Sequence, residues 1–211
     1  MHTLAKPAGL PVFPPHADPD GDCVLARWLA DCPEAAAVPW PDGFAGGIAH
    51  RLDVGTSGAL AVAGDVAELE ALRRAFSEKR LVKTYRFLTR RQVSWASGGC
   101  DRAIAHDRRR KRRMVVQRGP NTPHRGRWLP AETRFRRVGV VEHGTVWEAT
   151  MRSGVMHQIR VHAAFVGLVL AGDPVYGGGE PVPGGAPFAL HHVGFEGAGF
   201  ATTEVPSPSW A

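Results

Sequence analysis

Asp53 interrupts an otherwise apolar, strand-like stretch and has the character of a chemical site. Arg51 precedes it by two positions, and a turn bounded by Gly55 and Gly58 follows it. A carboxylate is costly to bury unless it is paired, and beside a guanidinium it would stay ionised. Such a group could act as a nucleophile or a base. An ordinary turn carboxylate would give the same local pattern, so both interpretations stay open at this point.

The elements that position such a site are predicted from hydrophobic periodicity. A strand over residues 81–89 places Lys83 and Tyr85 on one face, because side chains alternate along a strand. A helix over residues 156–166 carries Ile159, His162 and Ala163 on its inner stripe. Three further elements are expected, namely a helix at 24–29 capped by Asp22, a helix at 66–79 with Asp65 near its start, and a strand at 145–151. This mixture indicates an α+β fold with a largely antiparallel sheet.

Composition limits the class of protein. The chain has 211 residues, of which 44% are hydrophobic and 22% charged, and this fits one globular domain over residues 1–211. A net charge of +6 favours a polyanionic partner. The cysteines are far apart and form no Cys-x-x-Cys pair, which predicts a reducing cytoplasm. Neither a membrane-spanning segment nor a secretory signal is evident, so no membrane association is expected.

The strongest charge feature is the run from Arg108 to Arg113, in which every residue is basic. A solvated loop is the usual explanation of a charge run. Because this run has one sign only, a polyanion would relieve its self-repulsion, and we favour contact with an RNA backbone. The residues predicted to make it are Arg109, Arg110, Arg112 and Arg113. Such contacts would supply affinity and orientation without sequence choice.

The ten histidines invite a metal hypothesis, which their spacing does not support. His157 and His162 are five positions apart, so they would not lie one above the other on a helix. Neighbouring His191 and His192 would point in opposite directions on a strand. We therefore predict no metal.

Several segments together resemble the RluA-type pseudouridine synthases, which isomerise uridine in ribosomal and transfer RNA. The segment from His50 to Gly58 is similar to the family's catalytic signature, and Lys83-Thr84-Tyr85 to its Lys-x-Tyr motif. The segment from Ser153 to His162 resembles the motif that ends in His-Gln-Ile-Arg-Val-His. Three more segments are similar to the family: Lys6 to Val12 at the start, and Gly172-Asp173-Pro174 and Leu190-His191 near the end. All of these segments occur in the same order as in the family.

The resemblance implies a pseudouridine synthase fold, with a curved mixed sheet, flanking helices and a central RNA-binding cleft. It implies Asp53 as nucleophile or base, Arg160 as the partner of its carboxylate, and Tyr85 as a stacking ring with a hydroxyl for proton transfer.

Arg51 would fill the space that a flipped base vacates, and Leu190 would pack beneath the uracil. Lys83, His157 and Gln158 are expected at the substrate as well. An isomerisation gains and loses nothing overall, so no cofactor is expected.

Two departures from the family pattern stand out. Val155 and Met156 replace the usual arginine and threonine, which affects substrate contacts more than the chemistry. The chain also starts close to the catalytic core, so we expect that no S4-type RNA-binding domain is present. The catalytic domain itself is then expected to recognise RNA, not DNA, and to act as a monomer. Two alternatives remain: an inactive RNA-binding protein of the same fold, and a hydrolase that uses Asp53 with a histidine. No nucleophile elbow is present to support the hydrolase.

Overall fold

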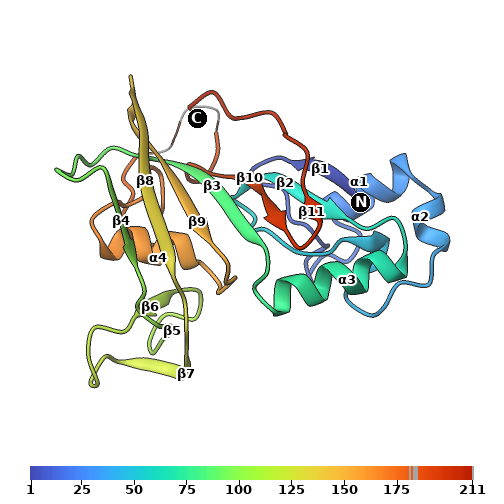
Figure 1. The fold of residues 1–211 in the computed structure, drawn as a ribbon, viewed down its shortest axis with the longest axis horizontal. Coiled ribbons are helices and arrows are strands. Elements are labelled where there is room, and N and C mark those ends of the chain that lie inside the picture. The colour runs from blue at the N-terminus through green and yellow to red at the C-terminus, as the bar shows by residue number, and fades with distance from the viewer. Residues whose placement is uncertain (181, 183–184, 211) are drawn as a thin grey trace. The chain divides into compact units, whose positions relative to one another are not determined.

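A computed structural model describes residues 1–180, 182 and 185–210 of the chain. The chain, drawn in Figure 1, divides into two compact units. Each unit contains a cluster of buried apolar residues. Unit 1 comprises Met1–Lys83 and His191–Ser207, and unit 2 comprises Thr84–Leu190 and Pro208–Ala211. The expectation of one domain over the whole chain stays a prediction.

Unit 1 holds three helical segments, a short 3-10 turn among them, before its long helix. Its elements are β1 (His2–Lys6), α1 (Val24–Asp31), α2 (Glu34–Ala37), η1 (Ala45–Gly47), β2 (Ser57–Val62), α3 (Val66–Ser77), β10 (Leu190–Gly197), apart from its first residue, and β11 (Phe200–Ala201). β2 pairs antiparallel with β1 and parallel with β10, which pairs antiparallel with β11. The inner face of α3 consists of Leu69, Leu72 and Ala75. It belongs to one apolar cluster with Ala61 of β2, Phe195 of β10 and Leu81.

Local hydrogen bonds explain where the helices of unit 1 begin. Asp65 caps α3, because its carboxylate accepts from the Glu68 N–H at 2.8 Å, and the expected helix there is confirmed. The helix at 24–29 is also confirmed, but the predicted cap was wrong. The Cys23 thiol accepts from the Ala26 N–H at 3.3 Å. Asp22 is instead paired with Arg27 one turn along the helix, which removes its carboxylate from the cap position.

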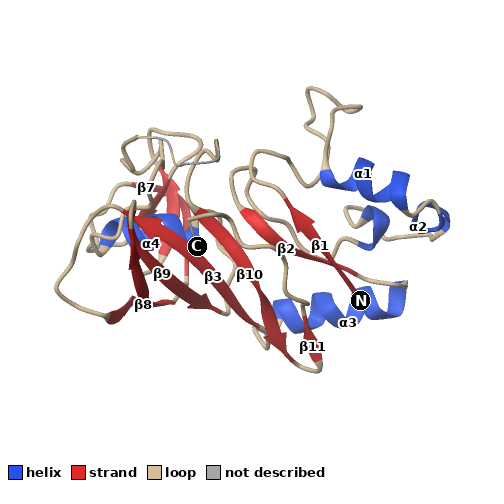
Figure 2. Cartoon of the chain, turned by 90° about the horizontal axis from the view of Figure 1, so that it is seen from above, coloured by secondary structure: helices blue, strands red, loops and turns tan. Residues whose placement is uncertain are grey.

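Unit 2 is built mostly of strands (Figure 2). Its elements are β3 (Val82–Thr89), β4 (Ser97–Cys100), β5 (Ile104–Asp107), β6 (Met114–Val116), β7 (His124–Leu129), β8 (Thr133–Val141), β9 (Gly144–Met151) and α4 (Gln158–Phe165). One set of neighbours runs β3-β9-β8-β4, and a small sheet runs β6-β5-β7. The small sheet and the β4-β8-β9 pairings are antiparallel. An apolar cluster contains Leu88, Val146, Ala171, Val182, Ala189 and Trp210.

The predicted strands at 81–89 and 145–151 correspond to β3 and β9 and are confirmed. The last predicted helix exists as α4, and its inner residues are buried as expected. Its predicted start at Met156 was wrong, because His157 adopts a left-handed conformation with φ of 56° and the helix begins at Gln158. The mixed, mainly antiparallel α+β architecture is confirmed. None of the helices in the described part of the chain has the length and apolar character needed to span a bilayer.

Candidate active site

The loop that carries Asp53 is fastened on both sides of the carboxylate. Asp53 is half-buried, and it follows Leu52, which is fully packed in unit 1. Its carbonyl accepts from the Thr56 N–H at 2.9 Å, which closes a tight turn. The Val54 carbonyl accepts from the Gly9 N–H at 2.8 Å, so the opening segment of the chain ties down the same turn.

Lys6 lies beneath this loop as a buried cation. Only 2% of the residue is exposed, and its ammonium donates to three carbonyl oxygens, those of Pro7 at 3.0 Å, Val54 at 3.1 Å and Thr56 at 2.7 Å. Burial lowers the pKa of Lys6 to about 8, and the nearby negative charge of Asp53 acts in the opposite direction. Lys6 therefore fixes the loop and places a positive charge beside the candidate nucleophile. Its identity as a lysine that ends an apolar strand was the available signal for this role.

The histidine before Asp53 has a structural role. The Ala61 N–H donates to Nε2 of His50 at 3.0 Å, which requires that nitrogen to be unprotonated. Burial, and then the charges of His192 and Lys83, hold the pKa of His50 well below its usual value. Its ring packs edge-on against Phe195 with the centroids 5.7 Å apart. His50 therefore belongs to the core that supports the loop.

The end of the Asp53 loop is joined directly to β10. The Ser57 hydroxyl and Nδ1 of His191 are hydrogen-bonded at 2.9 Å. Gly58 has φ of +120° and is paired with His192, and a Cβ at this position would overlap the His192 backbone. Only glycine permits this close approach of the two strands, which explains why a glycine closes the motif.

Two further predicted site residues belong to unit 1. Arg51 is exposed, as a residue that replaces a flipped base would have to be. Lys83 is half-buried, with its ammonium 5.6 Å from the centroid of the Phe76 ring. Burial lowers the pKa of Lys83 to about 8. Both side chains keep their predicted substrate roles as proposals.

Arg160 forms a two-pronged ion pair with Asp173 inside unit 2. Nε donates to Oδ2 at 2.7 Å and Nη2 donates to Oδ1 at 2.9 Å. The two side chains are 5% and 0% exposed. The backbone N–H groups of Val175 and Tyr176 also donate to Oδ1 of Asp173. Asp173 thus fixes one edge of the Arg160 guanidinium and is a positioning residue. Its place in the Gly172-Asp173-Pro174 motif was the signal in the sequence, although no role was predicted for it.

Aromatic rings enclose the same guanidinium. The Arg160 Cζ atom lies 4.2 Å from the centroid of the Phe188 ring and 5.3 Å from that of Tyr176. The predicted pairing of Arg160 with Asp53 joins residues of different units and stays a prediction. Nε and Nη2 of Arg160 bind Asp173. The predicted pairing with Asp53 would therefore use the other edge of the guanidinium, which is formed by Nη1 and Nη2.

Three further predicted site residues, Tyr85, Leu190 and His157, belong to unit 2. Tyr85 is buried in β3 with 7% exposed, and Leu190 is buried at the start of β10. Nδ1 of His157 and the Tyr176 hydroxyl are 3.2 Å apart. Burial raises the pKa of that hydroxyl to about 12, so Tyr176 stays protonated.

Gln158 uses every hydrogen-bonding position of its amide within unit 2. Nε2 donates to the Glu132 carbonyl at 2.9 Å and to the Thr133 hydroxyl at 3.1 Å. Oε1 accepts from the Ser153 hydroxyl at 2.9 Å and from the Val155 N–H at 3.2 Å. These contacts position the turn before α4, and the expected contact of Gln158 with the substrate stays a prediction.

The arginine run folds into a turn organised by Asp107. Oδ1 of Asp107 accepts from the backbone N–H groups of Arg109 at 2.8 Å and Arg110 at 3.0 Å. The first of these bonds is the main reason that the pKa of Asp107 lies below its usual value. The Asp107 N–H donates to the Arg113 carbonyl at 2.9 Å and closes the turn. Arg109, Arg110 and Arg112 are exposed, while Arg113 is half-buried.

No group of three or more potential ligands is assembled for a metal ion among the described residues. The buried histidines are instead hydrogen-bonded to protein groups, such as His162, which contacts the Thr133 hydroxyl at 2.9 Å and the Arg102 carbonyl at 2.8 Å.

The family of this chain is identified by its similarity to known proteins. A family model described as RNA pseudouridylate synthase matches residues 1–165, a span that contains Asp53, Tyr85 and Arg160. The chain belongs to the RNA pseudouridylate synthase family. The resemblance seen in the sequence motifs is thereby confirmed.

Relatives of this chain include proteins named ribosomal large subunit pseudouridine synthase D. The protein from Vibrio vulnificus is 33% identical over 183 residues, which cover 87% of this chain and 52% of the relative. The protein from Xanthomonas campestris pv. campestris is 35% identical over 184 residues, covering 87% and 51%. The chain therefore spans about half the length of the curated relatives it matches.

A solved structure confirms the pseudouridylate synthase fold. Human RNA Pseudouridylate Synthase Domain Containing 1 superimposes with a TM-score of 0.73 and 23% sequence identity, covering 98% of this chain and 80% of that one. Within this family the chain departs at Val155 and Met156. Ser153 and the Val155 backbone bind Gln158, so the turn is held although the usual arginine is replaced, and Met156 is 39% exposed.

Proposed function

We propose that this chain converts uridine in RNA to pseudouridine. The observation that carries the proposal is the family match over residues 1–165, which includes the three predicted catalytic residues. The fastened, half-buried Asp53 and the buried, oriented Arg160 are the geometry expected of side chains that need fixed positions. The names of the relatives support RNA of the large ribosomal subunit as the substrate class.

The reaction breaks the bond between N1 of uracil and C1′ of the ribose and joins C5 to C1′. The proton on C5 leaves and N1 gains one, so atoms and charge balance without an external reactant. The uridine must first leave its stack, which costs a few kcal/mol and is least costly in unpaired RNA. Arg51 is exposed and long enough to occupy the vacated space.

Asp53 supplies the carboxylate that attacks the nucleoside at the sugar or removes a proton there. Lys6 and its three carbonyl contacts hold the loop so that this carboxylate keeps one orientation. Arg160 pairs with the same carboxylate through the guanidinium edge that Asp173 leaves to it. A charge-assisted pair of this kind keeps the nucleophile aligned.

Tyr85 acts on the base. Its ring offers a flat surface for the uracil, and its hydroxyl carries the proton lost from C5 or C2′. Leu190 packs beneath the uracil as an apolar contact. Lys83 and His157 contact the substrate around this base.

The proposal is tested by replacing Asp53 with asparagine, which keeps the shape of the side chain and removes the nucleophile. Pseudouridine formation, measured by tritium release from 5-tritiated uridine in ribosomal RNA fragments, should be abolished. Affinity for the same RNA, measured by filter binding, should change little. Arg27→Gln serves as the active control, because Arg27 lies in an exposed ion pair with Asp22 and has no predicted role at the site.

The outcomes separate this proposal from the alternatives. Equal turnover by the wild type and Asp53→Asn would remove Asp53 from the chemistry. RNA binding without turnover by the wild type would favour the inactive RNA-binding protein. Mapping pseudouridines in ribosomal and transfer RNA with and without the gene identifies the target class.

The cellular setting is proposed as well. Cys23, Cys32 and Cys100 are free thiols, which supports a reducing cytoplasm. Action as a monomer and preference for RNA over DNA stay predictions.

A further inference from the structure

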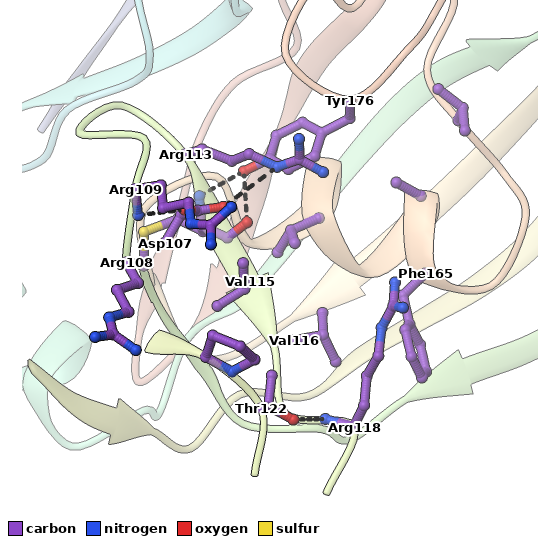
Figure 3. Close-up of a pocket in the computed structure, with 15 residues that line it drawn as sticks. Asp107, Arg108, Arg109, Arg113, Val115, Val116, Arg118, Thr122, Phe165 and Tyr176 are labelled. Atoms are coloured by element: carbon purple, nitrogen blue, oxygen red, sulfur yellow. Dashed lines mark hydrogen bonds and ion pairs between the residues drawn. The ribbon is translucent and has the colours of Figure 1, made fainter. Parts of the chain in front are cut away.

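A cavity in unit 2 combines basic and apolar walls. It has a volume of about 620 Å³ and lies where the small β6-β5-β7 sheet meets α4 (Figure 3). Its charged lining consists of four arginines, Arg108, Arg109, Arg113 and Arg118, and one carboxylate, Asp107. α4 contributes apolar side chains, among them Phe165, of which 39% is exposed. Small-molecule sites commonly have volumes of about 300–1,000 Å³.

The turn at Asp107 divides the arginine run into two groups. Arg109 and Arg113 line the cavity. Among the described residues that line it, Arg110 and Arg112 of the same turn do not occur. The run is therefore not a uniform basic surface, and two equal pairs of charges differ in whether they face the cavity.

Arg113 has a buried donor that lacks an acceptor within the described protein. Its Nε atom is inaccessible to solvent and has no hydrogen-bond partner there. The nearest carboxylate oxygen, Oδ2 of Asp107, is 3.9 Å away, which is beyond hydrogen-bond distance. Buried N–H donors are rarely left unpaired, so Arg113 lacks one hydrogen-bond partner within the described protein. Because 34% of the Arg113 side chain is exposed, an anion in the cavity can contact its accessible atoms, although not Nε.

We propose that this cavity binds one unstacked nucleotide of the RNA substrate, with its phosphate at Arg109 and Arg113 and its base against Phe165. The inference rests on the proposed function in taking RNA as the partner. Arginine matches the geometry of a phosphate through two parallel hydrogen bonds. Bases stack on exposed aromatic rings in proteins that hold single strands, whatever their sequence.

The Tyr176 ring connects this cavity to the candidate active site within unit 2. The Arg113 Cζ atom lies 5.5 Å from the centroid of the ring, and the Arg160 Cζ atom lies 5.3 Å from it. A nucleotide bound at Arg113 is therefore separated from Arg160 by one aromatic side chain. The cavity would hold a nucleotide near the target uridine and fix the direction of the strand.

The two pairs of arginines provide a matched test. Arg109→Gln/Arg113→Gln and Arg110→Gln/Arg112→Gln remove the same charge from the same turn. Binding of a fluorescein-labelled single-stranded RNA of twelve nucleotides is measured by anisotropy over a series of salt concentrations. The first double variant should flatten the plot of log affinity against log salt by roughly 0.7 for each phosphate that the protein no longer neutralises. The second should flatten the plot less, because Arg110 and Arg112 are not among the described residues that line the cavity.

The stacking contact is tested by Phe165→Leu, which keeps an apolar side chain and removes the ring. Loss of one stacked base should weaken binding of the same RNA by about fivefold or more. Circular dichroism and thermal unfolding check that each variant is folded. As a measurement on the wild type, RNA that contains 4-thiouridine is crosslinked by light, and the attached peptide should come from residues 158–169.

Each outcome is decisive. Equal effects of the two arginine pairs would show a diffuse electrostatic contact and overturn the proposal, as would crosslinking elsewhere. UMP and ribose 5-phosphate are titrated separately by calorimetry. Tight binding of UMP, with RNA affinity unaltered by Arg109→Gln/Arg113→Gln, would make the cavity a site for a free nucleotide instead. Because these assays measure binding without turnover, they are independent of whether Asp53 catalyses isomerisation.

Discussion

Replacement of Asp173 by asparagine should destabilise unit 2 strongly, although the two side chains have almost the same shape. The Asp173 carboxylate accepts four hydrogen bonds, two of them from Arg160 at 2.7 and 2.9 Å. If the asparagine oxygen keeps the Oδ1 contacts to Val175, Tyr176 and Nη2 of Arg160, its NH₂ group takes the place of Oδ2 and faces the Nε donor of Arg160. A charge-assisted contact is thereby replaced by two opposed donors, and a buried cation is deprived of its counter-charge from Asp173.

The magnitude follows from the burial of the pair. Arg160 is 5% exposed and Asp173 is 0% exposed, so water cannot take the place of the missing carboxylate oxygens. Removing one partner of a buried ion pair costs about 3–5 kcal/mol. For a chain of this length each kcal/mol lowers the unfolding temperature by roughly 2–4 °C, so a decrease of roughly 6–20 °C is expected. Turnover should also fall at temperatures where the variant is folded, because Arg160 is no longer held in one orientation.

The assay is urea and thermal unfolding followed by circular dichroism at pH 7. Asp22→Asn is the matched control, since Asp22 also binds an arginine through two contacts, Arg27 Nε to Oδ1 at 2.9 Å and Nη2 to Oδ2 at 2.5 Å. Both partners there are 58% exposed, and the unfolding midpoint should hardly move. If Asp173→Asn changed stability no more than Asp22→Asn, the inference that burial makes the Arg160 pair essential would be refuted.

Two further predictions concern Tyr85 and His50. Tyr85→Phe should bind RNA like the wild type, since the ring remains, but form pseudouridine at least tenfold more slowly in single-turnover assays; an equal rate would exclude the hydroxyl from proton transfer. Burial lowers the pKa of His192 to about 4 and that of the adjoining His50 well below its usual value. The unfolded chain therefore binds more protons than the folded one between pH 4 and 6.5, and stability falls as pH decreases, by about 2 kcal/mol for His192 alone between pH 7 and 4.5. His50→Gln can still accept from the Ala61 N–H and cannot titrate, so urea unfolding should show a shallower pH dependence than for the wild type; an unchanged dependence would mean that His50 is not buried in the neutral form.

Periodicity predicted α1, α3, β3, β9 and α4, each of which buries apolar side chains. The inner face of α3 repeats at helical spacing, and Asp65 supplies a cap that is common before such a face. The ends were less predictable, because they depend on single residues. The Cys23 thiol caps α1, and the left-handed conformation of His157 delays the start of α4. Neither feature has a strong sequence signature.

The site was predicted residue by residue, while its supporting contacts were not. Lys6 and Asp173 act through partners elsewhere in the sequence, Thr56 and Arg160 respectively. Nothing in the spacing of a single sequence specifies such pairs. The arginine run illustrates the same limit, since the turn closed by Asp107 decides which arginines face the cavity.

Asp53 and Asp173 differ in burial, and this difference separates the role that we propose for each. Both Asp53 and Asp173 follow a hydrophobic segment and precede a turn, and both lie near a cation. Asp173 is fully buried and its oxygens accept four hydrogen bonds, so its electron pairs are committed to holding Arg160. Asp53 is only half-buried, and backbone carbonyls accept the hydrogen bonds from Lys6, Gly9 and Thr56 that fasten its loop. The backbone around Asp53 is therefore held in place while the residue stays partly exposed, which suits the nucleophile role that we propose, whereas the Asp173 carboxylate serves as a structural counter-ion.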